Sequence, residues 1–361
     1  MAETKRLGDI ATYVNGYAFK PDDWCEEGLP IIRIQDLTGT SYQQNYYRGD
    51  YPAKIEVNNG GVLISWSASL GVYVWNRGKA LLNQHIFKVA FDKVEVDKQY
   101  FVYAVQYNLD NMPSKMHGAT MKHIVKKDFD NIVVPFPTLA EQKQIASILK
   151  RAKDAIEDRK RQLTELDSLV RSRFVEMFGD AIQNEKNWET DTVDNLCKDI
   201  CGGGTPSKAH PEYYEGGNIP WVSSKDMKTD ILIDSQIKIN QLGVDNSTAK
   251  IVPANSVIMV IRSVILKHTL PIAINAVPIT VNQDLKVFIP SEKILTKFLA
   301  VQFKMQEKDI LSGVRAVTAD NLEFNSLKQR MLIVPPVDLQ EQFVEFVAQI
   351  DKSKLHYVDI M

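Results

Sequence analysis

A heptad pattern between Thr138 and Gly179 constrains the fold more than any other part of the chain. No Pro or Gly interrupts this segment, Thr138 and Glu141 form a capping box, and Gly179 suits the residue after a helix. At 1.5 Å per residue it predicts a helix of roughly 60 Å. Ordinary core helices rarely exceed about 20 residues, so this narrow stripe predicts a partner helix. The a and d positions are Ile145, Leu149, Ala152, Ile156, Arg159, Leu163, Leu166, Val170, Phe174 and Met177.

The length of 361 residues predicts two or three domains, and the 44% hydrophobic and 24% charged residues are typical of a globular protein. Three sparse cysteines fit a reducing cytosol, and Cys197 and Cys201, which lack a second pair or a nearby His for a zinc site, indicate structural roles. The N-terminus lacks an apolar signal region, and no run of about 18 apolar residues occurs. We therefore expect a cytoplasmic protein that does not contact a membrane.

The net charge of the chain is −2, and each of its two globular parts is nearly neutral. Residues 1–137 carry 15 basic and 15 acidic groups, and residues 179–337 carry 17 and 18. Proteins that bind nucleic acid are usually basic. A DNA-binding role would therefore require Lys and Arg concentrated on one face, or a basic partner that supplies phosphate contacts.

The chain contains an internal repeat with an offset that drifts from 190 to 200 residues. Five pairs of segments occur in the same order, which indicates a duplicated domain followed by a long helix. The pairs are GLPIIRIQDL (28–37) with GNIPWVSSKDM (217–227), GGVLISWSAS (60–69) with NSVIMVIRSV (255–264), Asn83-Gln84 with Asn282-Gln283, GATMKHI (118–124) with AVTADNL (316–322), and VVPFPTLAEQ (133–142) with IVPPVDLQEQ (333–342).

Both copies predict the same order of elements. A short helix opens each copy, at 4–14 and 189–200, and a Gly-rich turn and several short β-branched or aromatic strands follow. A helix at 98–110 or 294–306 and a final strand with proline complete the copy. The expected fold class is α+β, with two tandem mixed α/β domains, each with a twisted, barrel-like sheet, separated by long coiled-coil helices in a pseudo-twofold repeat. The expected boundaries are 1–137, 138–179, 180–337 and 338–361.

The second long helix is expected to begin at Asp338 as its cap and to be about 24 residues long, against about 40 for the first. Leu339, Phe343, Phe346, Ile350, Ser353 and Tyr357 form its seam. An antiparallel pair would then overlap over only part of the first helix. The uncovered part, near Ile145 or between Leu163 and Met177, would need another subunit.

Motifs for catalysis are absent from the sequence. The segment GGGTPSK (202–208) is not a phosphate loop, and no H-E-x-x-H, G-x-S-x-G or Asn-Pro-Pro-aromatic motif occurs. The six histidines lack partners at metal-ligand spacing. Carboxylates and lysines of a nuclease site are too common to be diagnostic. We expect a chain without catalysis, metal or cofactor of its own.

The duplicated copies, the opening GGGTPSKAHPEYYEGGNIPWVSSKDM and the P-x-x-x-L-x-E-Q start of each long helix together resemble the specificity subunit of type I restriction–modification systems. The resemblance covers essentially the whole chain. In copy one, Asn15-Gly16-Tyr17-Ala18-Phe19 replaces Gly-Gly-Thr-Pro-Ser. The short second helix also departs from the family, whose two helices are usually similar in length, and truncation or a frameshift after about Lys354 would account for it.

The resemblance implies a non-catalytic subunit in which each copy is a target recognition domain for half of a bipartite sequence in double-stranded DNA. The long helices would set the spacing between the halves and dock two methyltransferase (modification) subunits, and restriction/translocase subunits would join the complex. S-adenosylmethionine, ATP and Mg²⁺ would then be bound by those partners. Two alternatives stay open, a coiled-coil adaptor without a DNA role and a self-sufficient methyltransferase or nuclease.

Candidate DNA-binding residues are polar or aromatic residues in the Gly-rich turns and strand-exit loops, because Arg can bridge guanine and Asn or Gln can pair with adenine. In copy one they are Asn15, Tyr17, Lys20, Arg33, Gln35, Ser65, Ser67, Gln84, His85, Lys115 and Lys122. In copy two they are Thr205, Ser207, Lys208, Ser223, Ser224, Lys225, Arg262, Ser263, Asn282, Gln283 and Arg315.

Three further side chains have two interpretations each. Arg262 interrupts the apolar strand VIMVIRSVIL, so it either contacts DNA or forms an internal salt bridge. Trp66 and Trp221 belong either to the DNA surface or to the core. Arg159 in the helix seam either sets the register or contacts a partner.

Overall fold

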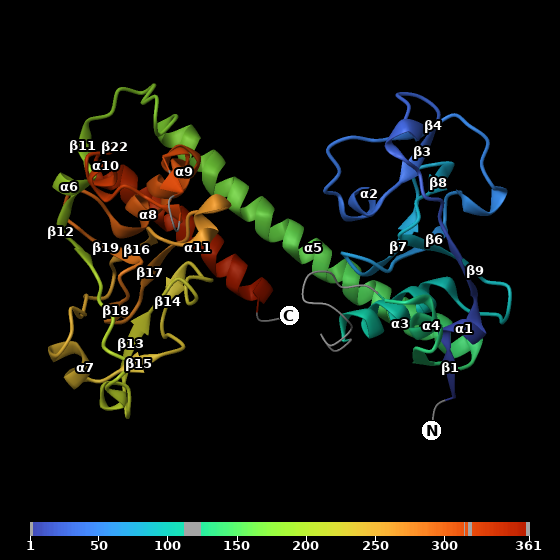
Figure 1. The fold of residues 1–361 in the computed structure, drawn as a ribbon. Coiled ribbons are helices and arrows are strands. Elements are labelled where there is room, and N and C mark those ends of the chain that lie inside the picture. The colour runs from blue at the N-terminus through green and yellow to red at the C-terminus, as the bar shows by residue number, and fades with distance from the viewer. Residues whose placement is uncertain (1–2, 112–123, 314, 317–319, 359–361) are drawn as a thin grey trace. The chain divides into compact units, whose positions relative to one another are not determined.

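The computed structural model describes residues 3–111, 124–313, 315–316 and 320–358. The chain forms two compact units, Met1–Glu157 (unit 1) and Asp158–Met361 (unit 2). Helix α5 (Leu139–Phe178) runs without interruption through the boundary between them (Figure 1). In the described part of the chain, no helix is long and apolar enough to cross a membrane.

Unit 1 combines short strands with a few helices. Its helices are α1 (Leu7–Ile10), α2 (Ile34–Thr38), α3 (Lys98–Asp110), α4 (Lys126–Asp130) and the first part of α5, with 3₁₀-helices η1 (Pro21–Asp23) and η2 (Ala53–Ile55). Its strands are β1 (Thr4–Arg6), β2 (Thr12–Asn15), β3 (Leu29–Ile32), β4 (Tyr46–Tyr47), β5 (Glu56–Val57), β6 (Gly61–Ser65), β7 (Gly71–Trp75), β8 (Ala80–Leu82), β9 (Ile86–Ala90) and β10 (Val133–Pro135).

The strands of unit 1 form two main sheets and one small pair. One sheet has the order β2-β9-β6-β7, the other β4-β3-β8-β5, and β1 pairs with β10. Strand β3 runs parallel to β8, while the neighbours of β6 are antiparallel. Four of the five residues of β6 are buried, as expected for a central apolar strand. Separate hydrophobic clusters form around the two sheets, and α3 packs on the first.

Unit 2 has the same kind of elements. Its helices after α5 are α6 (Val193–Leu196), α7 (Gln241–Asp245), α8 (Thr296–Met305), α9 (Glu307–Ser312), α10 (Phe324–Lys328) and α11 (Val337–Val358), with η3 (Pro211–Tyr213) and η4 (Val264–Lys267). Its strands are β11 (Thr190–Thr192), β12 (Cys197–Gly202), β13 (Ile219–Val222), β14 (Ile231–Leu232), β15 (Lys238–Ile239), β16 (Val257–Val260), β17 (Ile272–Asn275), β18 (Thr280–Val281), β19 (Leu285–Pro290), β20 (Arg315–Ala316), β21 (Asp320–Asn321) and β22 (Met331–Ile333).

The sheets of unit 2 follow the plan of unit 1. A five-stranded sheet has the order β12-β19-β16-β17-β14, and a smaller one has the order β15-β13-β18. Strand β13 is parallel to β18, as β3 is to β8. The pair β11–β22 repeats the pair β1–β10. The duplicated domain expected from the sequence is therefore present as two folded copies of one topology.

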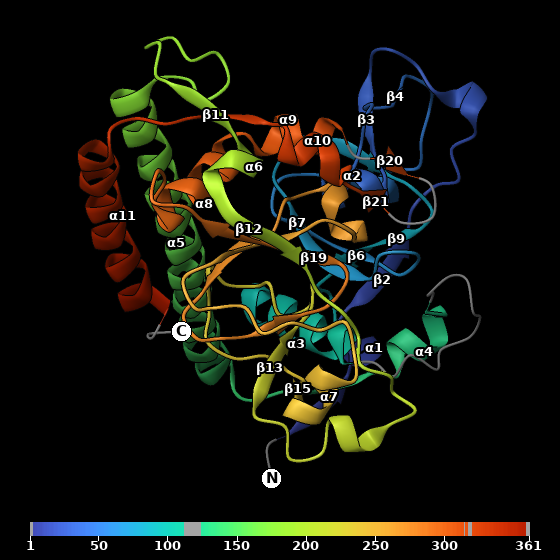
Figure 2. The ribbon, with the colours of Figure 1, turned by 90° about the vertical axis from the view of Figure 1, so that its left-hand side faces the viewer.

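The final helix packs antiparallel on the distal part of α5, within unit 2 (Figure 2). Phe343 of α11 meets Phe174 and Phe178 at ring-centroid distances of 5.6 Å. Further along α11, Lys354 Nζ lies 2.5 Å from Asp167 Oδ1. The partial antiparallel overlap expected from the sequence is confirmed, and it covers the distal region of α5 rather than the region near Ile145.

Three expectations from the sequence are corrected. The opening helices expected at 4–14 and 189–200 are single turns, α1 and α6. The residues before them form strands instead, because β1 pairs with β10 and β11 pairs with β22. The strands of each unit are divided between two main sheets instead of one barrel-like sheet. Helix α11 begins at Val337, so Asp338 lies inside its first turn and does not cap it.

Candidate nucleic-acid interface

In unit 1, the Gly-rich turn after β2 lies against the loop after β8. Tyr17 forms an isolated parallel bridge with Asn83, and the Tyr17 amide donates to the Leu82 carbonyl at 2.8 Å. A Cβ on Gly16 would lie only 2.0 Å from the Asn83 carbonyl oxygen. Glycine is therefore required here for the close approach of the two segments.

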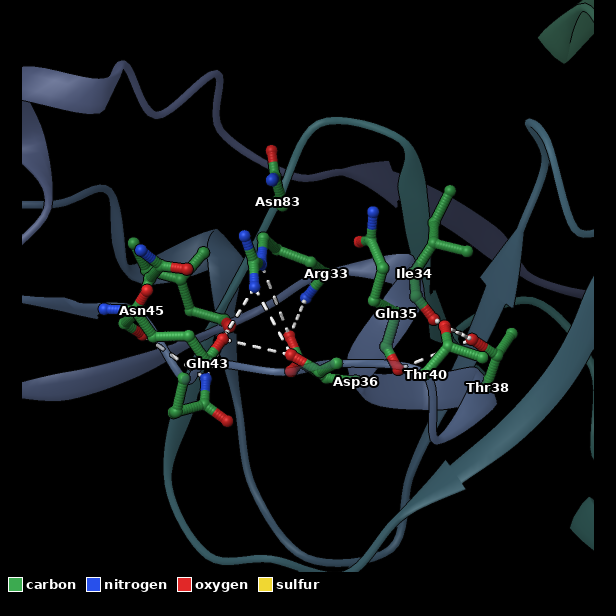
Figure 3. A network of polar contacts seen from close by, with 12 residues as sticks. Arg33, Ile34, Gln35, Asp36, Thr38, Thr40, Gln43, Asn45 and Asn83 are labelled. Atoms are coloured by element: carbon green, nitrogen blue, oxygen red, sulfur yellow. Dashed lines mark hydrogen bonds and ion pairs between the residues drawn. The ribbon is translucent and has the colours of Figure 1, made fainter. Parts of the chain in front are cut away.

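The turn after β3 is held by a carboxylate. The Arg33 amide donates to Asp36 Oδ2 at 2.8 Å, and Asp36 is only 3% exposed. The Arg33 guanidinium donates from Nη2 to the Gln43 carbonyl at 2.7 Å and to Ser41 Oγ at 3.3 Å. Figure 3 shows the Gln35 side chain turned away from this network. Arg33 thus fastens the loop at 41–43, while Gln35 is exposed.

A cleft of about 420 Å³ lies where these loops meet in unit 1. Ala68, on its rim, has a left-handed backbone with φ of 59°, an uncommon conformation for a residue with a side chain. The cleft brings together four predicted candidates, Arg33, Gln35, Ser67 and His85, with Ile34, Thr38, Thr40, Ala68, Ser69, Asn83 and Ile86.

Unit 2 builds the same frame from different residues. A Cβ on Gly203 would lie 1.7 Å from the Val281 carbonyl oxygen, so this turn also needs glycine. The Ser223 amide donates to Asp226 Oδ2 at 2.9 Å, as Arg33 does to Asp36. The Thr205 hydroxyl donates to Gln283 Oε1, which links the Gly-rich turn to the loop after β18.

Arg262 forms the internal salt bridge that was one of its two interpretations. Its Nε and Nη2 each lie 2.6 Å from Asp284 Oδ1. Asp284 Oδ2 accepts from Asn282 Nδ2 at 3.0 Å, and the Asp284 amide donates to Asn282 Oδ1 at 3.1 Å. The Arg262 side chain is still 46% exposed, so the ion pair does not remove it from the surface.

Two predicted candidates, Ser65 and Asn282, are buried. Ser65 is 0% exposed, and its hydroxyl donates to the Ser67 carbonyl at 3.2 Å. Asn282 is 7% exposed and is engaged by Asp284. Trp221 belongs to the core, where Nε1 donates to the Gly204 carbonyl at 2.9 Å. Trp66 is half-buried and stacks on Phe87 with ring centroids 5.7 Å apart.

The other candidates lie in the converging loops with some accessible surface. The exposed ones are Asn15, Tyr17, Lys20, Gln35, Gln84, His85, Thr205, Ser207, Lys208, Lys225, Arg262 and Gln283, and the half-buried ones are Arg33, Ser67, Ser223, Ser224 and Ser263. Lys115, Lys122 and the Arg315 side chain lie outside the described residues.

Sequence reasoning missed two residues of the frame, Asn83 and Asp284. Asn83 aligns with Asn282 in the repeat, and this match was the available signal. Asp284 follows directly after Asn282-Gln283. A carboxylate is not expected on a surface that meets phosphates, so the residue type of Asp284 gives no signal for a DNA-binding role.

The described part of the chain holds no group of three or more His, Cys, Asp or Glu side chains suited to a metal ion. Burial, with smaller contributions from Asp194 and Asp199, raises the pKa of the Cys197 thiol to about 12. This thiol therefore stays protonated at neutral pH and is a poor nucleophile.

The converging loops offer hydrogen-bond donors and acceptors, which suits recognition.

Comparisons with known proteins agree with this architecture. The sequence profile of the type I restriction modification DNA specificity domain matches residues 2–167 and 185–357. The EcoR124I/EcoR124II specificity subunit of Escherichia coli is 30% identical over 266 residues, which cover 71% of this chain and 64% of that protein. The MjaIX specificity subunit of Methanocaldococcus jannaschii is 22% identical over 307 residues, covering 80% and 70%. The chain thus spans just under two thirds of the length of the E. coli relative.

A solved structure has the same fold. The S subunit of a type I restriction–modification system from M. genitalium superposes with a TM-score of 0.59 at 15% identity, covering 99% of this chain and 91% of that one. The match extends over both units and is too dissimilar in sequence to indicate more than the fold. Because the family profile matches both copies over most of the chain, the protein belongs to the family of type I restriction modification DNA specificity domains, which it carries in tandem.

Proposed function

We propose that this chain is the sequence-specific DNA-recognition subunit of a type I restriction–modification complex, and that each unit reads one half of a bipartite target. The observation that carries the proposal is the repetition of one loop frame with different side chains. Both frames combine a turn that requires glycine, a turn capped by an aspartate, and the loop after β8 in unit 1 or β18 in unit 2. Different side chains on one frame suit two half-sites of different sequence, because base-edge contacts depend on the donors and acceptors presented.

The exposed candidates include side chains suited to base edges and side chains suited to phosphates. Gln35, Gln84 and Gln283 offer paired donors and acceptors that match the edge of adenine. Lys20, Lys208 and Lys225 carry compact charges suited to phosphate, which positions the protein without reading sequence. All six lie in or beside the converging loops. Each unit therefore offers exposed side chains of both kinds in these loops.

Partner subunits would complete the interface. The chain has a net charge of −2, too little basic charge to hold DNA tightly through phosphates alone. In this proposal two methyltransferase subunits bind S-adenosylmethionine and supply further phosphate contacts. Restriction subunits with ATP and Mg²⁺ join the same complex, and this chain performs no catalysis.

Helix α5 offers a surface for such a partner. Its seam residues Ile145, Leu149 and Ile156 are 37%, 41% and 46% exposed. Ile148, beside them, is 49% exposed. These four residues, the proximal stripe, lie on the part of α5 that belongs to unit 1, whereas α11 packs on the distal part. Docking of a modification subunit on the proximal stripe would bury them.

The test is reconstitution with a type I modification subunit, followed by mapping of methylated adenine in exposed DNA. We expect methylation within one asymmetric bipartite sequence, and weak binding by the isolated chain. Tight sequence-specific binding by the isolated chain would contradict our account of its charge. A reconstituted complex that methylates no defined sequence would exclude the DNA-recognition function and leave the coiled-coil adaptor.

A domain exchange assigns the half-sites. Replacing residues 1–137 by the first domain of another family member should change one half of the mapped sequence and preserve the other. A change in both halves would refute the model of two independent readers. Incubating the chain alone with Mg²⁺ or S-adenosylmethionine tests the remaining alternative, since any cleavage or methylation would identify a self-sufficient enzyme.

A further inference from the structure

The same pattern of backbone hydrogen bonds occurs at the end of the central strand, β6 or β16, in both units. In unit 1 the Trp66 amide donates to the His85 carbonyl at 3.4 Å, and the Ile124 amide donates to the Trp66 carbonyl at 2.9 Å. In unit 2 the Ile261 amide donates to the Asp284 carbonyl at 2.9 Å, and the Leu322 amide donates to the Ile261 carbonyl at 2.9 Å. Trp66 and Ile261 are therefore equivalent, as are His85 and Asp284.

It follows that the residues after Trp66 and Ile261 are equivalent too. They are Ser67 in unit 1 and Arg262 in unit 2. The same two positions thus carry Ser67 with His85 in one unit and Arg262 with Asp284 in the other. The backbone hydrogen bonds of Trp66 and Ile261 are the same, and the chains diverge at the residue after Ser67 and Arg262, where Ala68 has φ of 59° and Ser263 has φ of −176°.

In unit 2 the pair is fixed before any ligand arrives. Asp284 holds Arg262 through Oδ1, and Asn282, itself 7% exposed, holds Asp284 through Oδ2. In unit 1 the same positions lie open on the 420 Å³ cleft, and His85 packs edge-on against Trp66 with ring centroids 5.4 Å apart. At these two equivalent positions unit 2 therefore presents a guanidinium that an aspartate orients, whereas unit 1 presents a serine and a histidine.

We infer that Arg262, oriented by Asp284, is the residue of unit 2 that requires a guanine in its half-site. This assignment rests on the proposed DNA-recognition function. The contacts to Asp284 use Nε–H and one N–H of Nη2, and the remaining donors can bridge the O6 and N7 acceptors of guanine. A phosphate is a poorer partner, because the Asp284 carboxylate would repel it. Asp284 is a positioning residue that limits the rotamers of Arg262.

The test uses the reconstituted complex and duplexes that carry the mapped bipartite sequence. Each guanine of the half-site read by unit 2 is replaced in turn by 7-deazaguanine, which lacks the N7 acceptor. We expect the wild-type complex to lose about tenfold to a hundredfold in affinity at one of these guanines. Arg262→Gln should bind the normal and the substituted duplex equally weakly, whereas Asp284→Asn should retain a reduced difference.

The dependence of affinity on salt separates a base contact from a phosphate contact. Each lost phosphate contact lowers the slope of log affinity against log salt by about 0.9. We expect Arg262→Gln and Asp284→Asn to keep the wild-type slope. Lys225→Gln is the matched control, an exposed lysine of the same unit that should lower the slope and leave the 7-deazaguanine effect intact.

Two results would overturn the inference while leaving the proposed function standing. One is a lower salt slope in Arg262→Gln with uniform weakening on all sequences, which would make Arg262 a phosphate contact. The other is a half-site for unit 2 that contains no guanine sensitive to 7-deaza substitution. The second measurement needs only the wild-type complex, so it decides the question even if a variant fails to fold. Absence of any sequence-specific methylation by the wild-type complex would instead remove the proposed function.

Discussion

Gln142 and Gln340 occupy the same place in their respective units, and both are completely buried. Gln142 Oε1 accepts from the Asp97 amide at 2.9 Å, and its Nε2 donates to the Pro137 carbonyl at 2.8 Å. Gln340 Oε1 accepts from the Leu295 amide at 2.9 Å, and its Nε2 donates to the Pro335 carbonyl at 2.8 Å. Each glutamine thus connects the start of a long helix to the residue before an earlier helix of the same unit, α3 or α8.

Replacing Gln340 should destabilise unit 2. In Gln340→Ala the part-buried Leu295 amide loses its acceptor, which costs about 1 kcal/mol or more of unfolding free energy. Denaturant unfolding followed by circular dichroism measures the loss. Gln342→Ala is the matched control, because Gln342 is an exposed residue of the same helix and its loss should be nearly neutral. Equal destabilisation by both variants would contradict a structural role for the buried Gln340 that the exposed Gln342 lacks.

This pair also shows where sequence comparison reaches its limit. The repeat, the long helices and the order of elements followed from apolar periodicity and turn residues. The sequence match between the starts of the two long helices, however, pairs Gln142 with Gln342 at an offset of 200. The backbone pairing of β10 and β22 instead gives an offset of 198, because Val134 and Leu332 hold equivalent positions. Two glutamines in one helical turn cannot be told apart without knowledge of which one is buried.

The candidate site was predictable at the level of loops and less so at the level of side chains. Gly-rich turns and strand ends located the frame, because glycine and polar residues mark such places. For Ser65 the sequence does not show that the side chain is buried and that its hydroxyl donates to the Ser67 carbonyl. The role of Asp284 depends on contacts with Arg262 and Asn282, two residues distributed over separate loops. Only the folded chain reveals such a network.

The start of α5 predicts a dependence on pH. Hydrogen bonds from the Thr138 side chain and amide hold the pKa of Glu141 below its ordinary value of 4.5. A lowered pKa in the folded state stabilises the fold above the ordinary carboxyl range, and the contribution disappears as the pH falls through the folded pKa. The melting temperature of the wild type should therefore fall between about pH 6 and pH 3 by an amount that includes the Glu141 contribution, and Glu141→Gln should lack this part of the decrease.

An exposed glutamate of the same helix provides the comparison for this measurement. Glu165→Gln should follow the wild-type pH profile, because the capping box at Thr138 and Glu141 is left intact. Identical profiles for the wild type and Glu141→Gln would show that the capping box does not contribute in solution.

Substitutions in the proximal stripe should weaken binding of the modification subunit without lowering the stability of this chain. Ile145→Ser combined with Leu149→Ser should leave the melting temperature nearly unchanged, because both side chains are already more than a third exposed. The double variant should bind the modification subunit more weakly, since apolar area that docking would bury is lost. Leu169→Ser with Val175→Ser is the control, because these residues are each 47% exposed but lie outside the heptad seam. Equal weakening by both double variants would argue against a localised docking surface.

The equivalence of Ser67–His85 with Arg262–Asp284 predicts that specificity can be moved between the units. The double substitution S67R/H85D should give unit 1 a guanine requirement in its own half-site, with about tenfold to a hundredfold discrimination. The cleft at these positions has room for the longer side chain, and Asn83 stands where Asn282 holds Asp284 in unit 2. Methylation mapping of the reconstituted complex measures the change. Either single substitution should do less, because an unfixed arginine loses more rotamer freedom on binding and a lone carboxylate repels DNA. A double variant that alters the half-site of unit 2, or that binds all sequences more tightly without a guanine preference, would show that the pair does not carry specificity by itself.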